Sequence, residues 1–254
     1  MPDTAQRQAA AFGQRLEDLL SGVLGPIVGD NDMGYVRKPE GSYARGGGTS
    51  YTISQAEPKG ILLYCSGEPV LLLTFVFLCS CRDADAPLQV DKSSVMLSDA
   101  ITHSPLVRYD FVRRASSEIP SAHINIYGSN DAATRLMLAC AGGQRSKSRR
   151  KQYVDKGAFP TFSSLHFPVG GDRFRPGLED LLQMAVYEFH IDAADGWWDV
   201  IEVSRETYRA EQVRALAREF PDIVFETLRD MGYVTGDVPQ RPERGDVQSR
   251  LRKY

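Results

Sequence analysis

Two neighbouring segments carry polar side chains whose types and spacing could do chemistry. They are PLVRYDFVRR, residues 105–114, and AHINIYG, residues 122–128. Side chains alternate between the two faces of a strand, so a hairpin turning near residue 117 gathers the polar ones on one face. That face holds Arg108, Asp110, His123, Asn125 and Tyr127, with Arg108 opposite Tyr127, Asp110 opposite Asn125, and Val112 opposite His123. The other face is apolar and takes Val107, Tyr109, Phe111, Ile124 and Ile126.

The polar face allows two interpretations. A histidine beside an aspartate can be held in one tautomer, and a nearby arginine can clamp an anion. On this interpretation His123, Asp110 and His166 are catalytic candidates and Arg108 binds an anion. Clustered polar groups also occur in purely structural networks, to which Asn125 and Tyr127 would belong.

A glycine-rich and arginine-rich stretch, SLHFPVGGDRFRPGLEDLL, precedes an amphipathic helix. Arg173 and Arg175 come just before it, and helix starts attract anions, so both arginines are candidate anion-binding residues. Glu179 and Asp180 already place negative charge in the first turn. We therefore expect a shaped connector, in which Arg173 or Arg175 pairs with Glu179 or Asp180 and His166 packs toward the polar face.

A strongly basic segment, GGQRSKSRRKQYVDKG, follows at residues 142–157. It lacks apolar periodicity, which predicts a loop over residues 142–158. Its cations could contact the phosphates of a nucleic acid, although charge runs are also typical of solvated linkers. The candidate contacts are Arg145, Lys147, Arg149, Arg150 and Lys151.

The elements that position these residues follow from hydrophobic periodicity. A helical period predicts a helix over residues 2–24, and short β-branched and aromatic runs with short separators predict an antiparallel meander of about six strands over residues 50–128. Helical patterns return over residues 131–141, 176–189, 204–219 and 222–231. The fold class is therefore α+β, as one domain over residues 1–234 followed by a flexible polar tail over residues 235–254.

The composition and the hydrophobic pattern of the chain exclude several classes of protein. With 254 residues, 42% hydrophobic residues and a net charge of −3, the chain can bury a core, and any nucleic-acid surface on it must be local. The N-terminus lacks the pattern of a signal peptide, and the apolar run at residues 69–81 is too short to span a bilayer as a helix, so we expect no membrane partner. Cysteines without CxxC spacing favour core thiols in the cytoplasm. No motif indicates a metal or a cofactor, and we expect none.

The segments RYDFV, AHINIYG, SLHFPVGGDRFRPGLEDLL and REFPDIVFETLRDMGY together resemble a family of hypothetical proteins of actinobacteria and their phages. The resemblance covers about residues 45–233. It implies a cytoplasmic protein linked to a phage or a mobile element, and it carries no activity with it. It singles out His123, Asn125, His166, Arg173, Arg175 and Glu179.

Two functions from different classes remain. The first is a non-enzymatic binding or regulatory protein, of the kind found in phage-linked, toxin–antitoxin or defence loci, that binds a protein partner or binds nucleic acid through the basic loop. The second is a hydrolase or phosphodiesterase-like enzyme, with His123 as acid and base, Asp110 orienting it, and Arg108 and Arg173 stabilising charge. We favour the first function, because the sequence contains no recognisable motif for a catalytic nucleophile, a set of metal ligands or a phosphate-binding loop. A homo-oligomer is compatible with both.

Overall fold

The structure is a computed structural model of the chain. It describes residues 4–26, 34–43, 48–82, 86–113, 120–129, 131, 134, 137–138, 144–164, 167–169 and 175–239, and for residues 43, 144–146 and 167–168 it describes the backbone alone. An N-terminal helix precedes an antiparallel sheet, and further helices follow it. The predicted α+β class is thereby confirmed.

All pairings in the sheet are antiparallel. Its strands are β1 (Glu40–Tyr43), β2 (Thr49–Ser54), β3 (Ile61–Cys65), β4 (Glu68–Cys81), β5 (Gln89–Asp99), β6 (Pro105–Val112), β7 (Ala122–Ile126) and β8 (Phe167–Pro168). The order is β1-β2-β4-β5-β6-β7-β8. The long strand β4 pairs with β3 through its first half and with β2 through its second half, so these two shorter strands share one of its edges. The six predicted strands are all present, and the two edge strands β1 and β8 were not predicted.

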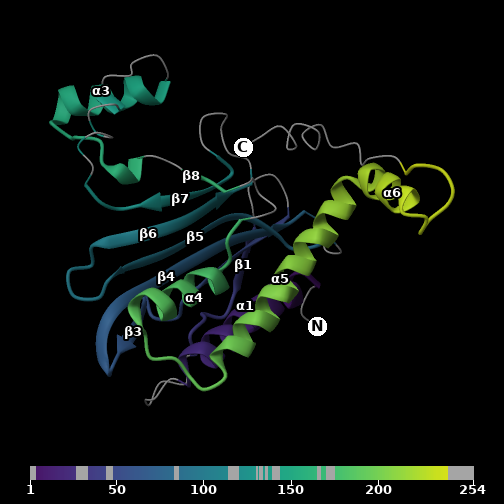
Figure 1. The fold of residues 1–254 in the computed structure, drawn as a ribbon, viewed down its shortest axis with the longest axis horizontal. Coiled ribbons are helices and arrows are strands. Elements are labelled where there is room, and N and C mark those ends of the chain that lie inside the picture. The colour runs from purple at the N-terminus through teal and green to yellow at the C-terminus, as the bar shows by residue number, and fades with distance from the viewer. Residues whose placement is uncertain are drawn as a thin grey trace.

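The helices are α1 (Thr4–Leu24), α3 (Gln144–Lys156), α4 (Leu178–Phe189), α5 (Trp197–Glu219) and α6 (Pro221–Asp230), with a short 3-10 turn, η1 (Phe162–Ser164), before β8. Helices α1, α4 and α5 gather over one face of the sheet, and α5 continues past it to α6 (Figure 1). The helix α1 buries the apolar face that its sequence period predicts, including Leu16, Leu19, Leu20 and Val23. These residues join Leu73, Phe75, Val95 and Leu97 of the sheet and Leu181, Leu182 and Ile201 of the later helices in one core.

Two helices differ from the sequence-based expectation. The basic segment forms α3, so the predicted loop over residues 142–158 is wrong. The prediction used hydrophobic periodicity alone, whereas glutamine, lysine and arginine are good helix formers and residues 144–156 contain no glycine or proline. The helix α5 begins at Trp197, seven residues before the predicted start at residue 204.

The C-terminal tail is described only to residue 239, so the predicted mobility of residues 235–254 lies for the most part outside the described residues. The arrangement of the helices and the sheet leaves two places where polar side chains gather. One lies on strands β6 and β7, and the other lies under α5.

Candidate functional site: a polar cluster and a helix-lined groove

Asp110 on β6 is the centre of the first polar cluster. Its Oδ2 atom accepts hydrogen bonds from Arg108 Nε at 2.8 Å and from Asn125 Nδ2 at 2.8 Å. His123 Nε2 lies 3.6 Å from the same oxygen. Arg108 also lies over the ring of Tyr127, with its Cζ atom 6.0 Å from the ring centroid. Three of the predicted residues therefore surround the carboxylate of Asp110, and a fourth, Tyr127, packs against Arg108.

The geometry of His123 fits a structural role better than proton transfer with a substrate. Its Nδ1 atom lies 3.0 Å from the carbonyl oxygen of Pro120, and a carbonyl only accepts, so Nδ1 carries the hydrogen of this bond. The other ring nitrogen faces Asp110, and only 5% of the side chain is exposed. A general base must reach the proton that it removes, so this burial works against the catalytic interpretation.

The strand register differs from the prediction by two residues. Asp110 pairs with His123 and Arg108 pairs with Asn125, whereas a hairpin that turns near residue 117 would place Asp110 opposite Asn125. A shift of two residues keeps every side chain on its face, because side chains alternate with a period of two. The polar residues are therefore together as expected, but with other neighbours.

Burial at this hairpin also differs from the prediction. His123 and Asn125, on the polar face, are buried, whereas Ile126 on the expected apolar face is 42% exposed. The turn η1 contacts β7, and β8 pairs with it, so later parts of the chain cover this strand. A prediction from alternation alone assumes that one face of a strand meets the core and the other meets water.

The second polar region is a groove between α1, α5 and the helix-covered face of the sheet. Its volume is about 1070 Å³. Apolar side chains that line it come from α1, β4, β5 and β6, and include Phe12, Leu16, Phe77, Val90, Val95 and Phe111. Along α5, lining residues run from Asp199 to Glu219. Three residues singled out in the sequence, Asp110, His123 and Arg175, are among its lining residues. Sequence reasoning did not find the groove as a whole, because it depends on how α1 and α5 pack on the sheet.

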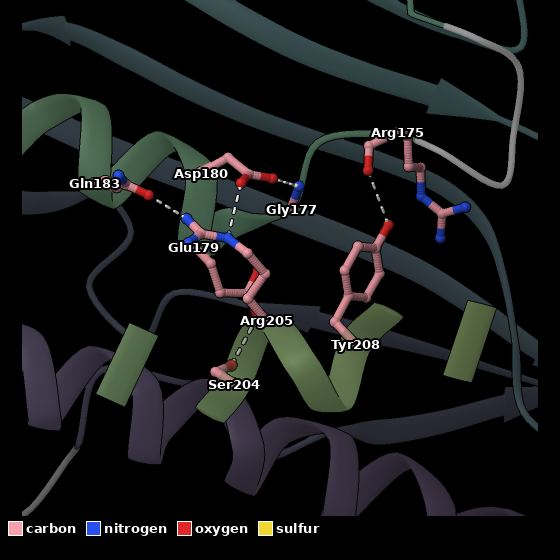
Figure 2. A network of polar contacts seen from close by, with 8 residues as sticks. All are labelled: Arg175, Gly177, Glu179, Asp180, Gln183, Ser204, Arg205 and Tyr208. Atoms are coloured by element: carbon pink, nitrogen blue, oxygen red, sulfur yellow. Dashed lines mark hydrogen bonds and ion pairs between the residues drawn. The ribbon is translucent and has the colours of Figure 1, made fainter. Parts of the chain in front are cut away.

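One wall of the groove is held by the polar network between α4 and α5 that Figure 2 shows. Arg205 Nε donates to Asp180 Oδ1 at 3.0 Å, and a second nitrogen of the same guanidinium donates to Gln183. Asp180 Oδ2 in turn accepts from the backbone N–H of Gly177, the residue that precedes α4, at 2.8 Å. These bonds fix the start of α4 against the middle of α5.

Glu179 is a buried carboxylate at the edge of the same groove. Its Oε1 atom accepts from Ser204 Oγ at 2.7 Å, and its other oxygen would lie 2.3 Å from a Cβ atom placed on Gly177. Burial raises the pKa of Glu179 above its usual range, although Ser204 partly opposes the shift. A bound partner that places a positive charge or a hydrogen-bond donor beside such a buried carboxyl group would favour its ionised form.

Arg175 lies at the same end of the groove. Its Cζ atom is 3.9 Å from the centroid of the Phe111 ring, and its carbonyl oxygen accepts from Tyr208 Oη at 3.3 Å. Asp180 forms an ion pair with Arg205 of α5, whereas the predicted pairing with Arg173 or Arg175 stays a prediction, because Arg173 lies outside the described residues. Sequence reasoning did not single out Arg205 or Ser204, because only helix packing brings α5 to α4. His166 and Arg173 lie outside the described residues.

None of the described cysteines lines the groove. Cys79 on β4 is buried, and burial raises the pKa of its thiol to about 12, so the thiolate form is rare at neutral pH. Cys65, Cys79 and Cys81 are free thiols, as expected, and Cys140 lies outside the described residues.

The basic residues of the predicted loop lie on α3. Lys147, Arg150 and Lys151 are exposed, and Arg149 donates to the carbonyl oxygen of Ser164 at 2.6 Å. The side chain of Arg145 lies outside the described ones. In the described part of the chain, no helix is long and apolar enough to cross a membrane. The same residues contain no group of three histidine, cysteine or acidic side chains placed to hold a metal ion.

Comparisons with known proteins add no activity to this geometry. No protein family model matches the chain, and no curated protein or solved structure matches it.

Proposed function

We propose that this chain is a non-enzymatic, cytoplasmic binding protein that holds an amphipathic helical segment of a partner protein in the groove between α1, α5 and the sheet. The observation that carries the proposal is the groove itself, with its volume of about 1070 Å³ and its mostly apolar floor. A regulatory role in a phage-linked, toxin–antitoxin or defence locus would be one use of such binding.

The length of the groove favours an extended partner. Its volume of about 1070 Å³ is at the upper end of the roughly 300–1,000 Å³ of small-molecule pockets, so the length of its helical wall is the distinguishing feature. The lining part of α5, from Asp199 to Glu219, is about 30 Å long at a rise of 1.5 Å per residue. An amphipathic helix laid along a groove buries its apolar stripe over such a length.

The chemistry of the rim also favours a peptide. Arg15 of α1 and Glu211 of α5 form an ion pair at 3.4 Å, and Arg214 and Arg218 follow along α5. A rim with both signs suits a partner whose polar side chains carry both signs, whereas an anionic small ligand would call for cations alone.

The proposal can be tested with a variant that fills the groove. Ser93 on β5 lines it, so Ser93→Trp should occupy part of its volume. Thr52 is exposed on β2 and points to the opposite face of the sheet, so Thr52→Trp is the matched control. The probe is a fluorescein-labelled peptide of 18 leucine, lysine and glutamate residues with a leucine stripe at helical spacing, followed by fluorescence anisotropy.

We expect the striped peptide to bind and a scrambled peptide of the same composition to bind at least tenfold more weakly. Ser93→Trp should weaken binding of the striped peptide about tenfold or more, because the indole takes the place of part of the apolar contact of the peptide, and tenfold corresponds to about 1.4 kcal/mol. Thr52→Trp should leave it unchanged. Equal affinities for both peptides, or equal losses in both variants, would overturn the proposal. So would binding of a dansylated fatty acid, blocked by Ser93→Trp, without any binding of the peptide.

A further inference from the structure

The helix α3 concentrates positive charge on a chain that is acidic as a whole. Residues 144–156 contain six basic side chains and one acidic one, Asp155, for a net charge of +5. The whole chain has a net charge of −3, so the remaining residues carry −8. Such a separation of charge creates a local positive potential without making the whole surface basic.

Three of these cations form a continuous exposed stripe. Lys147, Arg150 and Lys151 are spaced at i, i+3 and i+4, which places them side by side on one face of the helix. None of the three forms an ion pair with another described residue. Their charges are therefore open to an external anion.

The side of α3 opposite to the stripe is bonded to the rest of the chain, and this contact holds the helix in place. Arg149 donates to the carbonyl oxygen of Ser164, which belongs to η1, and η1 contacts β7. In Figure 1, α3 lies beyond the β7 end of the sheet, away from α1, α4 and α5. The stripe is thus separate from the groove, and a ligand could occupy each independently.

Two exposed aromatic side chains lie at the border of the stripe, between Arg150 and the side of α3 that carries Arg149. Tyr153, three residues after Arg150, is 38% exposed, and Phe159 is 61% exposed. Their ring centroids are 4.7 Å apart. Exposed rings beside a row of cations are the combination on which the bases and phosphates of single-stranded nucleic acid bind, because every base has a face that can stack.

We propose that α3 binds single-stranded nucleic acid, with Lys147, Arg150 and Lys151 on successive phosphates and Tyr153 stacked on a base. The binding is independent of sequence, because the stripe offers charge and stacking without a fixed set of groups for base edges. Three phosphate contacts on a single strand give a slope of about −2 for log K against log salt concentration.

The test uses the full chain and a fluorescein-labelled oligo-dT of 20 nucleotides, with anisotropy measured between 50 and 200 mM NaCl. Replacing Lys147, Arg150 and Lys151 together by alanine should weaken binding about 100-fold at 0.1 M salt and flatten the slope by about 2. Alanine keeps the helix, and circular dichroism checks that it does. The matched control replaces three exposed cations elsewhere, Arg37, Lys38 and Lys59, and should retain affinity and slope.

A second variant separates stacking from charge. Tyr153→Ala should weaken oligo-dT binding about tenfold and leave a 20-base-pair duplex unaffected, whereas Tyr153→Phe should bind like the natural chain. The inference is overturned if the triple variant keeps its affinity or if the control triple variant loses as much. It is also overturned if polyglutamate displaces oligo-dT at equal charge, which indicates an acidic protein partner, or if only phosphatidylserine vesicles bind.

Discussion

Asp110 shows how one carboxylate can organise a hairpin. It accepts from Arg108 and from the buried Asn125 and lies close to His123, so three side chains from two strands depend on it. The alternation of polar residues in the sequence was sufficient to group these side chains. It could not supply the register or the burial, because both depend on the path of the turn and on which later segments cover β7.

Replacing Asp110 with alanine should destabilise the fold by about 1–3 kcal/mol, because it leaves the amide of Asn125 buried without its acceptor. Urea unfolding measures the change. Asp195→Ala, at an exposed position of the α4–α5 loop, is the control and should stay within about 0.5 kcal/mol. A change below 0.5 kcal/mol for Asp110→Ala would show that the cluster contributes little to stability.

The raised pKa of Glu179 makes a second prediction, on pH. The pKa of the Glu179 carboxyl group is higher in the folded protein than its ordinary value of 4.5, so the folded chain binds more protons than the unfolded chain between these two pKa values. The contribution of Glu179 to the free energy of unfolding is therefore fully present below pH 4.5 and is lost as the pH rises through the folded pKa. Glu179→Gln removes this dependence and can still accept from Ser204. We expect the variant to be more stable than the natural chain at pH 7, with the difference closing toward pH 4.

The measurement is urea unfolding of both chains at several pH values between 4 and 7. Glu188→Gln, at an exposed position of the same helix, is the control and should show no such trend. A natural chain that gains stability relative to Glu179→Gln as pH rises would contradict the role given to burial.

At the scale of elements, the contact between α1 and α5 sets one end of the groove. Gly22 of α1 faces Val200 of α5 so closely that a Cβ atom at Gly22 would lie 2.7 Å from Val200 Cγ1. Hydrophobic period predicted α1 and α4 well, because each buries a regular stripe. It predicted neither the early start of α5 nor α3, because these helices depend less on a buried stripe and more on intrinsic helix propensity or packing.

Gly22→Ala should therefore destabilise the protein by about 1 kcal/mol, although alanine favours a helix interior over glycine by a similar amount. In a Val200→Ala background the same change should become stabilising, because the obstructing methyl groups are gone. Thermal or urea unfolding of the four chains forms a double-mutant cycle. Additive effects would mean that α1 and α5 adjust to the new side chain without strain.

At the scale of the whole molecule, the order of helix, sheet and helices follows from the sequence, because strands and helices have different periods and short separators require antiparallel neighbours. The groove does not follow from it. Its lining residues belong to α1, α5 and the strands, and they become a site only because these elements enclose a common space. The two proposed activities then occupy separate parts of the fold, because α3, which carries the basic stripe, lies away from α1 and α5, which line the groove (Figure 1).

The most direct test of the groove is amide hydrogen exchange of the full chain with and without the leucine-striped peptide. We expect binding to slow exchange in residues 8–19 of α1 and residues 199–219 of α5, which form its two helical walls, and to leave α3 unchanged. Slower exchange confined to α3, to α6 or to the edge strand β1, with no change in these two walls, would contradict the account.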